Sequence, residues 1–328
     1  MSNQPLVSVV MTVFKRTEYL EEAIQSVLNQ TYKDFELIVT DDANTVAAST
    51  ICQRFASDTR VRYRSNPNIL GAPLNVAAAM RETQGEFVTI INDDDLMEPT
   101  MLEKLLPPLQ SDPKCVLSFG DHWLMDASGA ILPEATEKHS RCGGRSNCPE
   151  GFVADPFAGA LRGMIPLVLG TIFRRAVYQE NWLIPDVAGA YDYWLALRFS
   201  LAGGNLYFAN ERVMRWRTHG NSESARLDPE KARCGVYMFQ MLLAENIPPG
   251  KRAIVKMKAS QSFFILGRDR FYFGQKASAR QAFWSSCKYQ PNFKSLAGIA
   301  LTCLPKKIGE IVLRRWKHGW EISQRLTA

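Results

Sequence analysis

The sequence lacks the motifs that define several common protein classes. No GxGxxG follows a strand-like segment and no GxxxxGK[ST] occurs, which disfavours a dinucleotide-binding dehydrogenase and a P-loop enzyme. No apolar run approaches the roughly 18 to 20 residues that a membrane span requires, so any membrane contact must be peripheral. The cysteines include no CxxC pair, and His139, Cys142 and Cys148 therefore lack the spacing expected of a zinc site. The chemistry of the chain must rest on other side chains.

Charge is unevenly distributed along the chain. From residue 251 to the end there are 16 Lys or Arg and three acids, whereas residues 1–250 carry 23 bases and 30 acids. The C-terminal quarter is thus suited to an anionic surface. The seven cysteines and the absence of a secretory signal favour a cytoplasmic protein. With 328 residues, 46% of them hydrophobic, the chain can form one large domain and a smaller appendage.

Short apolar strands alternate with helices over the first 110 residues. The segments "LVSVVMTVF" and "FELIVTDDAN" resemble strands covered on both faces, and "TEYLEEAIQSVLNQT" has helical spacing with Thr17 as the expected N-cap. This alternation predicts an α/β fold with a doubly wound, mostly parallel sheet flanked by helices, in which ligands bind beyond the carboxyl ends of the strands. We expect a catalytic domain at 1–228 and a helical, basic C-terminal region at 229–328.

An acidic triplet follows one of the predicted strands. In "FVTIINDDDLMEP", Asp93, Asp94 and Asp95 lie side by side. Neighbouring carboxylates repel one another unless a cation lies between them, and these oxygen ligands suit Mg²⁺ or Mn²⁺ bound together with a substrate's phosphates. Asp41 and Asp42 end another strand at the same expected edge, which favours a metal and nucleotide site. The alternative is an acidic turn that caps the following helix.

These segments also carry a family resemblance. "VSVVMTVFKRTEYLEEAIQSVLNQTYKDFELIVTDDAN" and "NILGAPLNVAAAMRETQGEFVTIINDDDLMEP" resemble the nucleotide-binding half of family 2 glycosyltransferases of the GT-A fold. The resemblance implies inverting transfer of a sugar from a nucleotide-diphosphate donor to an acceptor hydroxyl, with a nucleotide-sugar-binding half at 1–110 and an acceptor-side half at 111–228. It places these residues at the nucleotide: Thr12, Val13, Phe14, Arg16, Asp41, Asp42, Asn75 and Asp93. Asp93 and Asp95 match the family's metal-binding DxD signature, with Asp94 as a further candidate ligand.

The sequence departs from the family pattern at two places. A Pro-Thr-Tyr-Asn-like run is replaced by Thr12 to Lys15, which makes Lys15 a candidate phosphate contact. Inverting transfer needs a base that takes the acceptor proton, and the usual position in the matching segment "VAGAYDYWLALR" falls on Ala190. We expect Asp192, the only acid of that segment, to be the base, with Asp186 as the nearest alternative. A helix N-cap is the competing interpretation of Asp192.

Two further segments supply candidate site residues. "RWRTHGNSES" is similar to a family stretch that ends in a His followed by small polar residues. By this resemblance His219 completes the metal shell or meets the diphosphate, with Arg217 as a charge clamp. Asp121 and Trp123, in "FGDHW", lie where the family's acceptor side begins, and Trp123 would stack on a sugar ring. An exposed His219 and a core Trp123 without a functional role are the alternatives.

The C-terminal segment "LPKKIGEIVLRRWKHGW" joins apolar, basic and tryptophan side chains. It fits a helix in a lipid interface, or one packed on the catalytic domain. In the first case the acceptor is a saccharide or lipid-linked saccharide at the inner face of the plasma membrane. No nucleic-acid-binding module is found.

The prediction is therefore a metal-dependent inverting hexosyltransferase of cell-surface polysaccharide or glycolipid synthesis. Two rival functions remain open. A haloacid dehalogenase-like Mg-dependent phosphatase would use DxDx[TV], but Met97 stands where Thr or Val is expected. A non-catalytic, membrane-associated sugar-nucleotide binder would keep the fold without needing Asp192.

Overall fold

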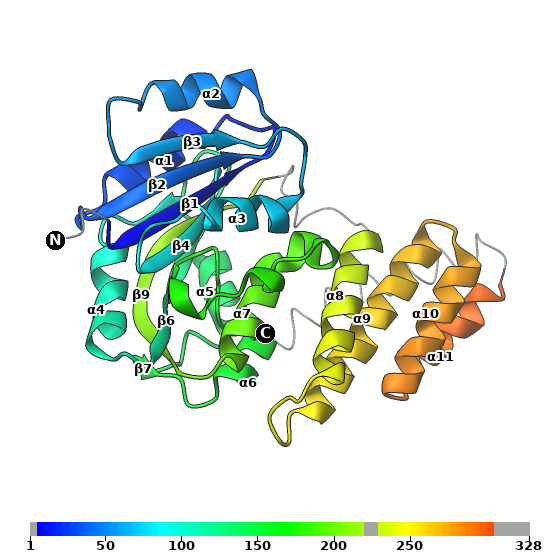
Figure 1. The fold of residues 1–328 in the computed structure, drawn as a ribbon. Helices are drawn as coiled ribbons and strands as arrows, with labels where there is room; N and C mark the ends of the chain where they lie inside the picture. Colours follow the sequence, from blue (N-terminus) through cyan, green and yellow to red (C-terminus); the bar gives the residue numbers. More distant parts are fainter. Residues whose placement is uncertain (1–4, 220–228, 305–328) are drawn as a thin grey trace. The chain divides into compact units, whose positions relative to one another are not determined.

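The computed structural model of the protein describes residues 5–219 and 229–304 (Figure 1). The chain divides into two compact units, Met1–Ser222 and Glu223–Ala328. Each unit contains buried apolar clusters of its own.

Within the described residues, unit 1 is built on a nine-stranded mixed sheet. Its order is β3-β2-β1-β4-β8-β6-β9-β5, with β7 paired to β9. The neighbours β3, β2, β1 and β4 are parallel, and β6 is parallel to β9, whereas β8 runs antiparallel to β4 and β6. The strands are β1 Val7–Val13, β2 Phe35–Asp41, β3 Val61–Ser65, β4 Phe87–Asn92, β5 Leu96–Met97, β6 Cys115–Met125, β7 Gly151–Phe152, β8 Thr171–Arg174 and β9 Asn205–Arg217. The predicted α/β sheet is confirmed.

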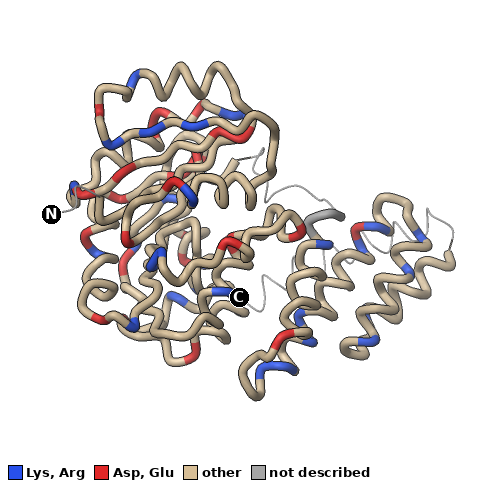
Figure 2. Tube along the Cα trace, in the orientation of Figure 1, with Lys and Arg blue, Asp and Glu red and all other residues tan. Residues whose placement is uncertain are grey.

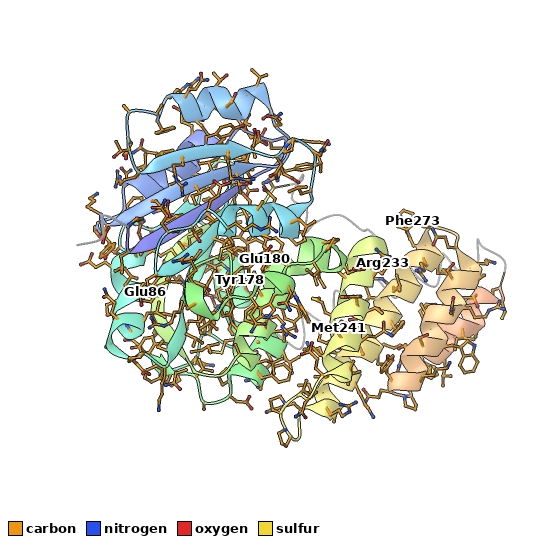
Figure 3. The ribbon with its side chains drawn as sticks, viewed as in Figure 1. Glu86, Tyr178, Glu180, Arg233, Met241 and Phe273 are labelled. Carbon is orange, nitrogen blue, oxygen red and sulfur yellow. The ribbon has the colours of Figure 1, made fainter. Side chains whose placement is uncertain are left out.

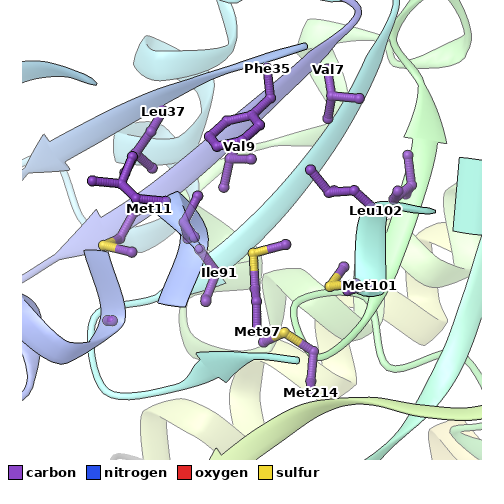
Figure 4. Packing of buried hydrophobic residues seen from close by; sticks show 14 of the residues in the cluster. Val7, Val9, Met11, Phe35, Leu37, Ile91, Met97, Met101, Leu102 and Met214 are labelled. Carbon is purple, nitrogen blue, oxygen red and sulfur yellow. The ribbon is translucent and has the colours of Figure 1, made fainter. Parts of the chain in front are cut away.

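Helices cover the sheet of unit 1 (Figure 1). They are α1 Leu20–Leu28, α2 Val46–Gln53, α3 Ala72–Met80, α4 Met101–Ser111, α5 Pro133–Cys142, α6 Pro156–Arg162 and α7 Tyr191–Leu201, with short 3₁₀ turns at Arg175–Val177, Glu180–Trp182 and Pro185–Ala190. Alternate side chains of β1, such as Val9 and Met11, join one cluster with apolar residues of α1 and α4 (Figure 4). Val10, between them, is equally buried and points to the opposite face. Burial on both faces explains why the strands read as continuous apolar runs.

Two helix starts differ from the sequence predictions. Thr17 is not the N-cap of α1, which begins after Tyr19 without a side-chain cap; the Thr17 carbonyl instead accepts a bond from Leu20 in the preceding turn. The acidic triplet does not cap α4, because β5 intervenes and Thr100 is the N-cap of that helix. The capping interpretation of Asp93 to Asp95 is therefore wrong.

Strand β9 links the two halves of unit 1. It is parallel to β6 along most of its length and antiparallel to β5, where Leu96 lies opposite Arg215. The end of β9 therefore runs beside the turn that carries the acidic triplet.

Unit 2 is helical in its described part. Its helices are α8 Pro229–Ala244, α9 Arg252–Tyr272, α10 Lys276–Tyr289 and α11 Phe293–Thr302. The ring of Phe283 fills a notch made by Gly267 and Gly298, where an added Cβ would come within 2.7 Å of ring atoms. This notch lets α9 and α11 approach α10 closely. The predicted interfacial segment around Ile308 to Trp320 lies outside the described residues.

In the part of the chain that the structure describes, the helices are too short or too polar to cross a bilayer.

Candidate active site

The carboxyl ends of three parallel strands meet at one edge of the sheet. Thr12 of β1 lies opposite Asn92 of β4, and Val13 lies opposite Asp41 of β2. The Thr12 hydroxyl donates to the Asn92 side chain at 3.3 Å. This is the edge at which open α/β sheets bind ligands, and both acidic segments reach it.

The acidic turn after β4 concentrates negative charge in a buried place. Burial and the charge of Asp94 raise the pKa of Asp93 to about 8, although the Phe14 N–H and the charge of Arg16 oppose the shift. Burial and the same Asp94 also raise the pKa of Asp95 well above its ordinary value. The Asp95 carboxylate is held in place by the backbone N–H of Arg217 at 2.9 Å and the Asn92 amide at 3.0 Å. A bound cation would stabilise the ionised form of these crowded carboxylates.

Asp94 lies at the centre of a polar triad. Its Oδ2 is 3.1 Å from His219 Nε2 and 3.5 Å from Arg16 Nη2, and Arg16 Nη1 lies 3.0 Å from the same imidazole nitrogen. The structure thus brings together three predicted site residues, of which Arg16 and His219 are 203 positions apart in the sequence. The exposed-loop alternative for His219 is wrong, because its side chain is only 7% exposed.

The start of α7 lies beside the acidic turn. Burial and the negative charges of Asp192, Asp95 and Asp93 raise the pKa of Tyr191, against a hydrogen bond with Thr12 that lowers it. Tyr191 therefore connects α7 to the strand edge. Tyr191 was not singled out from the sequence, and the one signal available for it was its place directly before Asp192.

Asp192 occupies the first turn of α7. Ala190 is the N-cap and has no side-chain bond, so the N-cap interpretation of Asp192 is wrong. Burial raises the pKa of the Asp192 carboxyl, although backbone N–H groups of Tyr193 and of Asp192 itself oppose the shift. Just upstream, Ala188 has a φ of 27°, a strained conformation for a residue other than glycine. The catalytic role of Asp192 stays a prediction.

Asp41 is fully buried and organises the loop after β2. Its carboxylate accepts bonds from the backbone N–H groups of Ala43 and Thr45 and from the Tyr63 hydroxyl, at 2.7 to 3.0 Å. Thr45 in turn caps α2. The position of Asp41 at the strand edge fits the predicted nucleotide pocket, but its oxygens are already hydrogen-bonded to the protein.

Asp42 and Asn75 have comparable internal partners. Asp42 accepts bonds from the backbone N–H groups of Leu70 and Gly71, and both Asp42 and Asn75 accept bonds from the Asn66 amide. This network fixes the loop before α3 against β2. The predicted contacts of Asp42 and Asn75 with a nucleotide remain predictions.

The segment after β1 is exposed toward solvent at Phe14. Phe14 is 45% exposed, its N–H lies 3.4 Å from Asp93 Oδ2, and the Lys15 ammonium lies over its ring. Lys15 has a φ of 62°, which turns the chain sharply between β1 and Arg16. The predicted nucleotide-lining residues Val13, Phe14 and Arg16 therefore lie next to the acidic turn.

The Arg217 side chain is buried in the protein and does not lie where it could act as the predicted charge clamp on a diphosphate. Its side chain is 1% exposed, and the guanidinium donates to the Asp94 carbonyl at 2.9 Å, the Ala127 carbonyl at 3.2 Å and Glu22 at 2.6 Å. It also lies 4.3 Å over the Tyr19 ring. These contacts join the acidic turn to α1, so Arg217 supports the site from inside. The clamp prediction missed this, because acceptors from distant segments cannot be read from sequence spacing.

Asp121 and Trp123 belong to a second polar cluster. Asp121 pairs with the fully buried Arg145 at 2.7 Å, and His139 bonds to His122 at 3.1 Å. The Arg212 guanidinium lies 4.2 Å over the half-buried Trp123 ring. Asp121 and Trp123 thus contact side chains on β9, on α5 and on the loop after α5, and their predicted acceptor role stays a prediction. His139 is hydrogen-bonded to His122 and Arg145.

Lowering the pH should destabilise unit 1 through these histidines. Burial and the charge of Arg145 lower the pKa of His122 to about 3, and the same two causes lower the pKa of His139. Below about pH 6.5 the unfolded chain takes up protons that the folded chain does not, so the free energy of unfolding falls with pH. For His122 the fall is at most about 1.4 kcal/mol per pH unit and continues to about pH 3, and His139 contributes in the same direction. Urea unfolding at a series of pH values measures this slope. The double variant His122→Asn with His139→Asn should show a flatter slope, and an unchanged slope contradicts the assignment.

The described residues offer no cage of three or more His, Cys, Asp or Glu side chains for a metal. Mg²⁺ and Mn²⁺ at phosphate sites commonly take only one or two carboxylates from the protein and the rest of their ligands from substrate and water. Asp93 and Asp95, buried beside Asp94, fit that donor set.

The chain matches known proteins in sequence and in fold. The family model "Glycosyl transferase family 2" matches residues 8–164. A putative teichuronic acid biosynthesis glycosyltransferase of Bacillus subtilis, TuaG, is 30% identical over 223 residues, which cover 68% of this chain and 82% of that protein. Several further relatives are matched over only 41% to 47% of their own length.

Two solved structures share the fold over nearly the whole chain. TarS of S. aureus, in complex with UDP-GlcNAc, has a TM-score of 0.63 at 13% identity and is matched over 90% of both chains. The mannosyltransferase PcManGT from Pyrobaculum calidifontis, in complex with GDP-Man and Mn²⁺, has a TM-score of 0.60 at 16% identity, covering 99% of this chain and 87% of that one. The chain therefore belongs to glycosyl transferase family 2 and is a glycosyltransferase with the GT-A fold.

Proposed function

We propose that the protein transfers a hexose from a nucleotide-diphosphate donor to an acceptor hydroxyl with inversion, in the presence of Mg²⁺ or Mn²⁺. The observation that carries this proposal is the acidic turn at Asp93 to Asp95, which lies at the carboxyl edge of the sheet next to the start of α7 and Asp192. TarS with UDP-GlcNAc and PcManGT with GDP-Man and Mn²⁺ support a nucleotide-sugar donor and a divalent cation.

Different residues of the chain would bind the nucleotide and the metal. The segment from Val13 to Arg16 lines the nucleotide side, and Arg16 offers a positive charge beside the acidic turn. When bound, the metal neutralises charge on the departing diphosphate. Asp93 and Asp95 would hold it.

Asp192 receives the proton. As the acceptor oxygen bonds to the anomeric carbon, the bond from that carbon to the diphosphate oxygen breaks, and the acceptor proton passes to the Asp192 carboxylate. A carboxyl whose pKa is raised by burial is a stronger base than an exposed one, which suits this role.

The acceptor class is inferred from the name of a relative. TuaG is named for teichuronic acid biosynthesis, which favours a saccharide or lipid-linked saccharide of the cell surface as acceptor. We place the reaction in the cytoplasm, at the inner face of the plasma membrane, with the basic C-terminal region against anionic lipids. The phosphatase alternative expects its motif after the first strand, whereas the acidic triplet follows β4.

Calorimetric titration of UDP, GDP and dTDP, each with and without Mn²⁺, tests the donor site. We expect one nucleotide to bind in a Mn²⁺-dependent manner, because Asp93 and Asp95 need a cation between them and a diphosphate. The Asp95→Asn variant should weaken that binding at least about tenfold, whereas Asp34→Asn, at an exposed acid, should leave it unchanged. Failure of all three nucleotides to bind folded protein would contradict the proposal for these donors.

A further inference from the structure

Three large apolar side chains on the last two described helices are exposed. Phe293 is 80% exposed, Leu296 50% and Trp284 51%, all within the pair formed by α10 and α11. Exposure of single apolar residues is ordinary, but a group of this size and aromatic content marks a contact surface. This group, together with Lys288 and Lys294, is called the α10–α11 surface.

The pattern of α11 shows that the exposure is not accidental. Phe293, Leu296 and Ala300 recur at helical spacing on its exposed side. Gly298 and Leu301, on the other side, pack against Phe283. A helix that is apolar on both sides needs a second apolar environment besides its own core.

The charge around this surface has one sign. Residues 270–304 contain five Lys or Arg and no Asp or Glu. Figure 2 shows the same excess of bases over acids along α8 to α11. Lys288 and Lys294 are both exposed and flank the turn that joins α10 to α11.

We propose that the α10–α11 surface docks on an anionic lipid bilayer. Trp284, Phe293 and Leu296 would enter the headgroup and upper acyl region, while Lys288 and Lys294 would contact anionic headgroups. The proposal rests on the proposed membrane location and names the part of the described chain that makes the contact.

The positive charge of the α10–α11 surface disfavours two other binding partners, a second copy of the protein and residues 305–328 of the same chain. A second copy of the same surface would bring like charges together, which is unfavourable across an interface. Residues 305–328 carry six Lys or Arg against two acids, so like charge also disfavours this segment as the occupant. An anionic bilayer offers an apolar environment for the exposed apolar side chains and negative headgroups for the lysines.

Sedimentation of the full chain with vesicles tests the docking surface without any transfer reaction, so its outcome is independent of the donor site. We expect binding to vesicles containing phosphatidylglycerol, little binding to phosphatidylcholine alone, and weakening by salt. Phe293→Ser with Leu296→Ser should weaken binding at least about tenfold, and Lys288→Glu with Lys294→Glu by a similar factor.

Phe273→Ser is the matched control. Phe273, labelled in Figure 3, is 51% exposed at the turn before α10, at the opposite end of that helix from the α10–α11 turn. Its loss should leave vesicle binding within about twofold of the wild type. Absence of binding by the wild type, equal binding by the surface variants, or an equal loss in the Phe273 control would overturn the proposal. A concentration-dependent dimer that Phe293→Ser abolishes would overturn it in favour of a second copy.

Discussion

The Asp192→Asn variant is expected to bind the nucleotide donor normally and to transfer sugar about 10² to 10⁴ times more slowly. The amide keeps the size and polarity of the carboxylate but cannot take the acceptor proton. Because Asn and Asp have nearly the same size, the substitution should keep the first turn of α7 in place and leave Asp93 and Asp95 where they are. Initial rates with a saturating donor, together with calorimetric donor affinity, separate loss of chemistry from loss of binding.

Asp186→Asn is the control for this variant. Asp186 lies in the 3₁₀ turn that precedes α7 and is exposed. We expect its activity to stay near that of the wild type. If Asp186→Asn is slow and Asp192→Asn is not, the base assignment moves to Asp186, while an unaffected rate in both variants would remove this segment from the chemistry.

The Arg217→Ala variant is expected to lower the free energy of unfolding by about 3 kcal/mol, since it leaves buried acceptors without their charged donor. The guanidinium bonds to the Asp94 and Ala127 carbonyls and to Glu22, and it is closed off from solvent. Metal-dependent nucleotide affinity should fall as well, because the acidic turn loses its support. Urea unfolding and calorimetry measure the two effects.

Arg215→Ala provides the comparison for Arg217. Arg215 lies two residues earlier on β9 and pairs with Glu98 through two bonds, but its side chain is 40% exposed. Exposed ion pairs contribute about 0 to 1 kcal/mol, so this variant should unfold nearly as the wild type does. Arg217→Lys keeps the charge but not the three-way bonding, and it should restore little of the nucleotide affinity. Full restoration by Lys would mean that charge alone matters at this position.

Much of the parallel half of the sheet could be predicted from the sequence. Strands β1, β2 and β4 start within a residue of the apolar segments that predict them. A strand buried on both faces needs apolar residues at nearly every position, and such a continuous apolar run can be recognised in the sequence. Helix α1 was predicted in place, but its start was not, because Thr17 turned out to begin a turn rather than to cap the helix.

The antiparallel part was harder to predict. Strand β8 lies between β4 and β6, although it follows β6 in the chain by some 45 positions. Pairing between distant segments depends on their mutual packing, which a local pattern does not contain. The same holds for β5, only two residues long, which separates the acidic turn from α4.

The sequence by itself determined the α/β class and the strand ends that carry Asp41 and Asp93 to Asp95, because these depend on residue type and periodicity. The candidates Asp192 and His219 followed from the resemblance to family 2 glycosyltransferases. Only the tertiary structure decided how they meet. It brought His219 and Arg16 onto Asp94, placed Tyr191 beside Thr12, and turned Arg217 inward. These contacts join residues far apart in sequence. Their geometry is set by the pairing of β9 with β6 and β5 within the sheet and by the position of α7 beside the strand ends, which no local run of residues encodes.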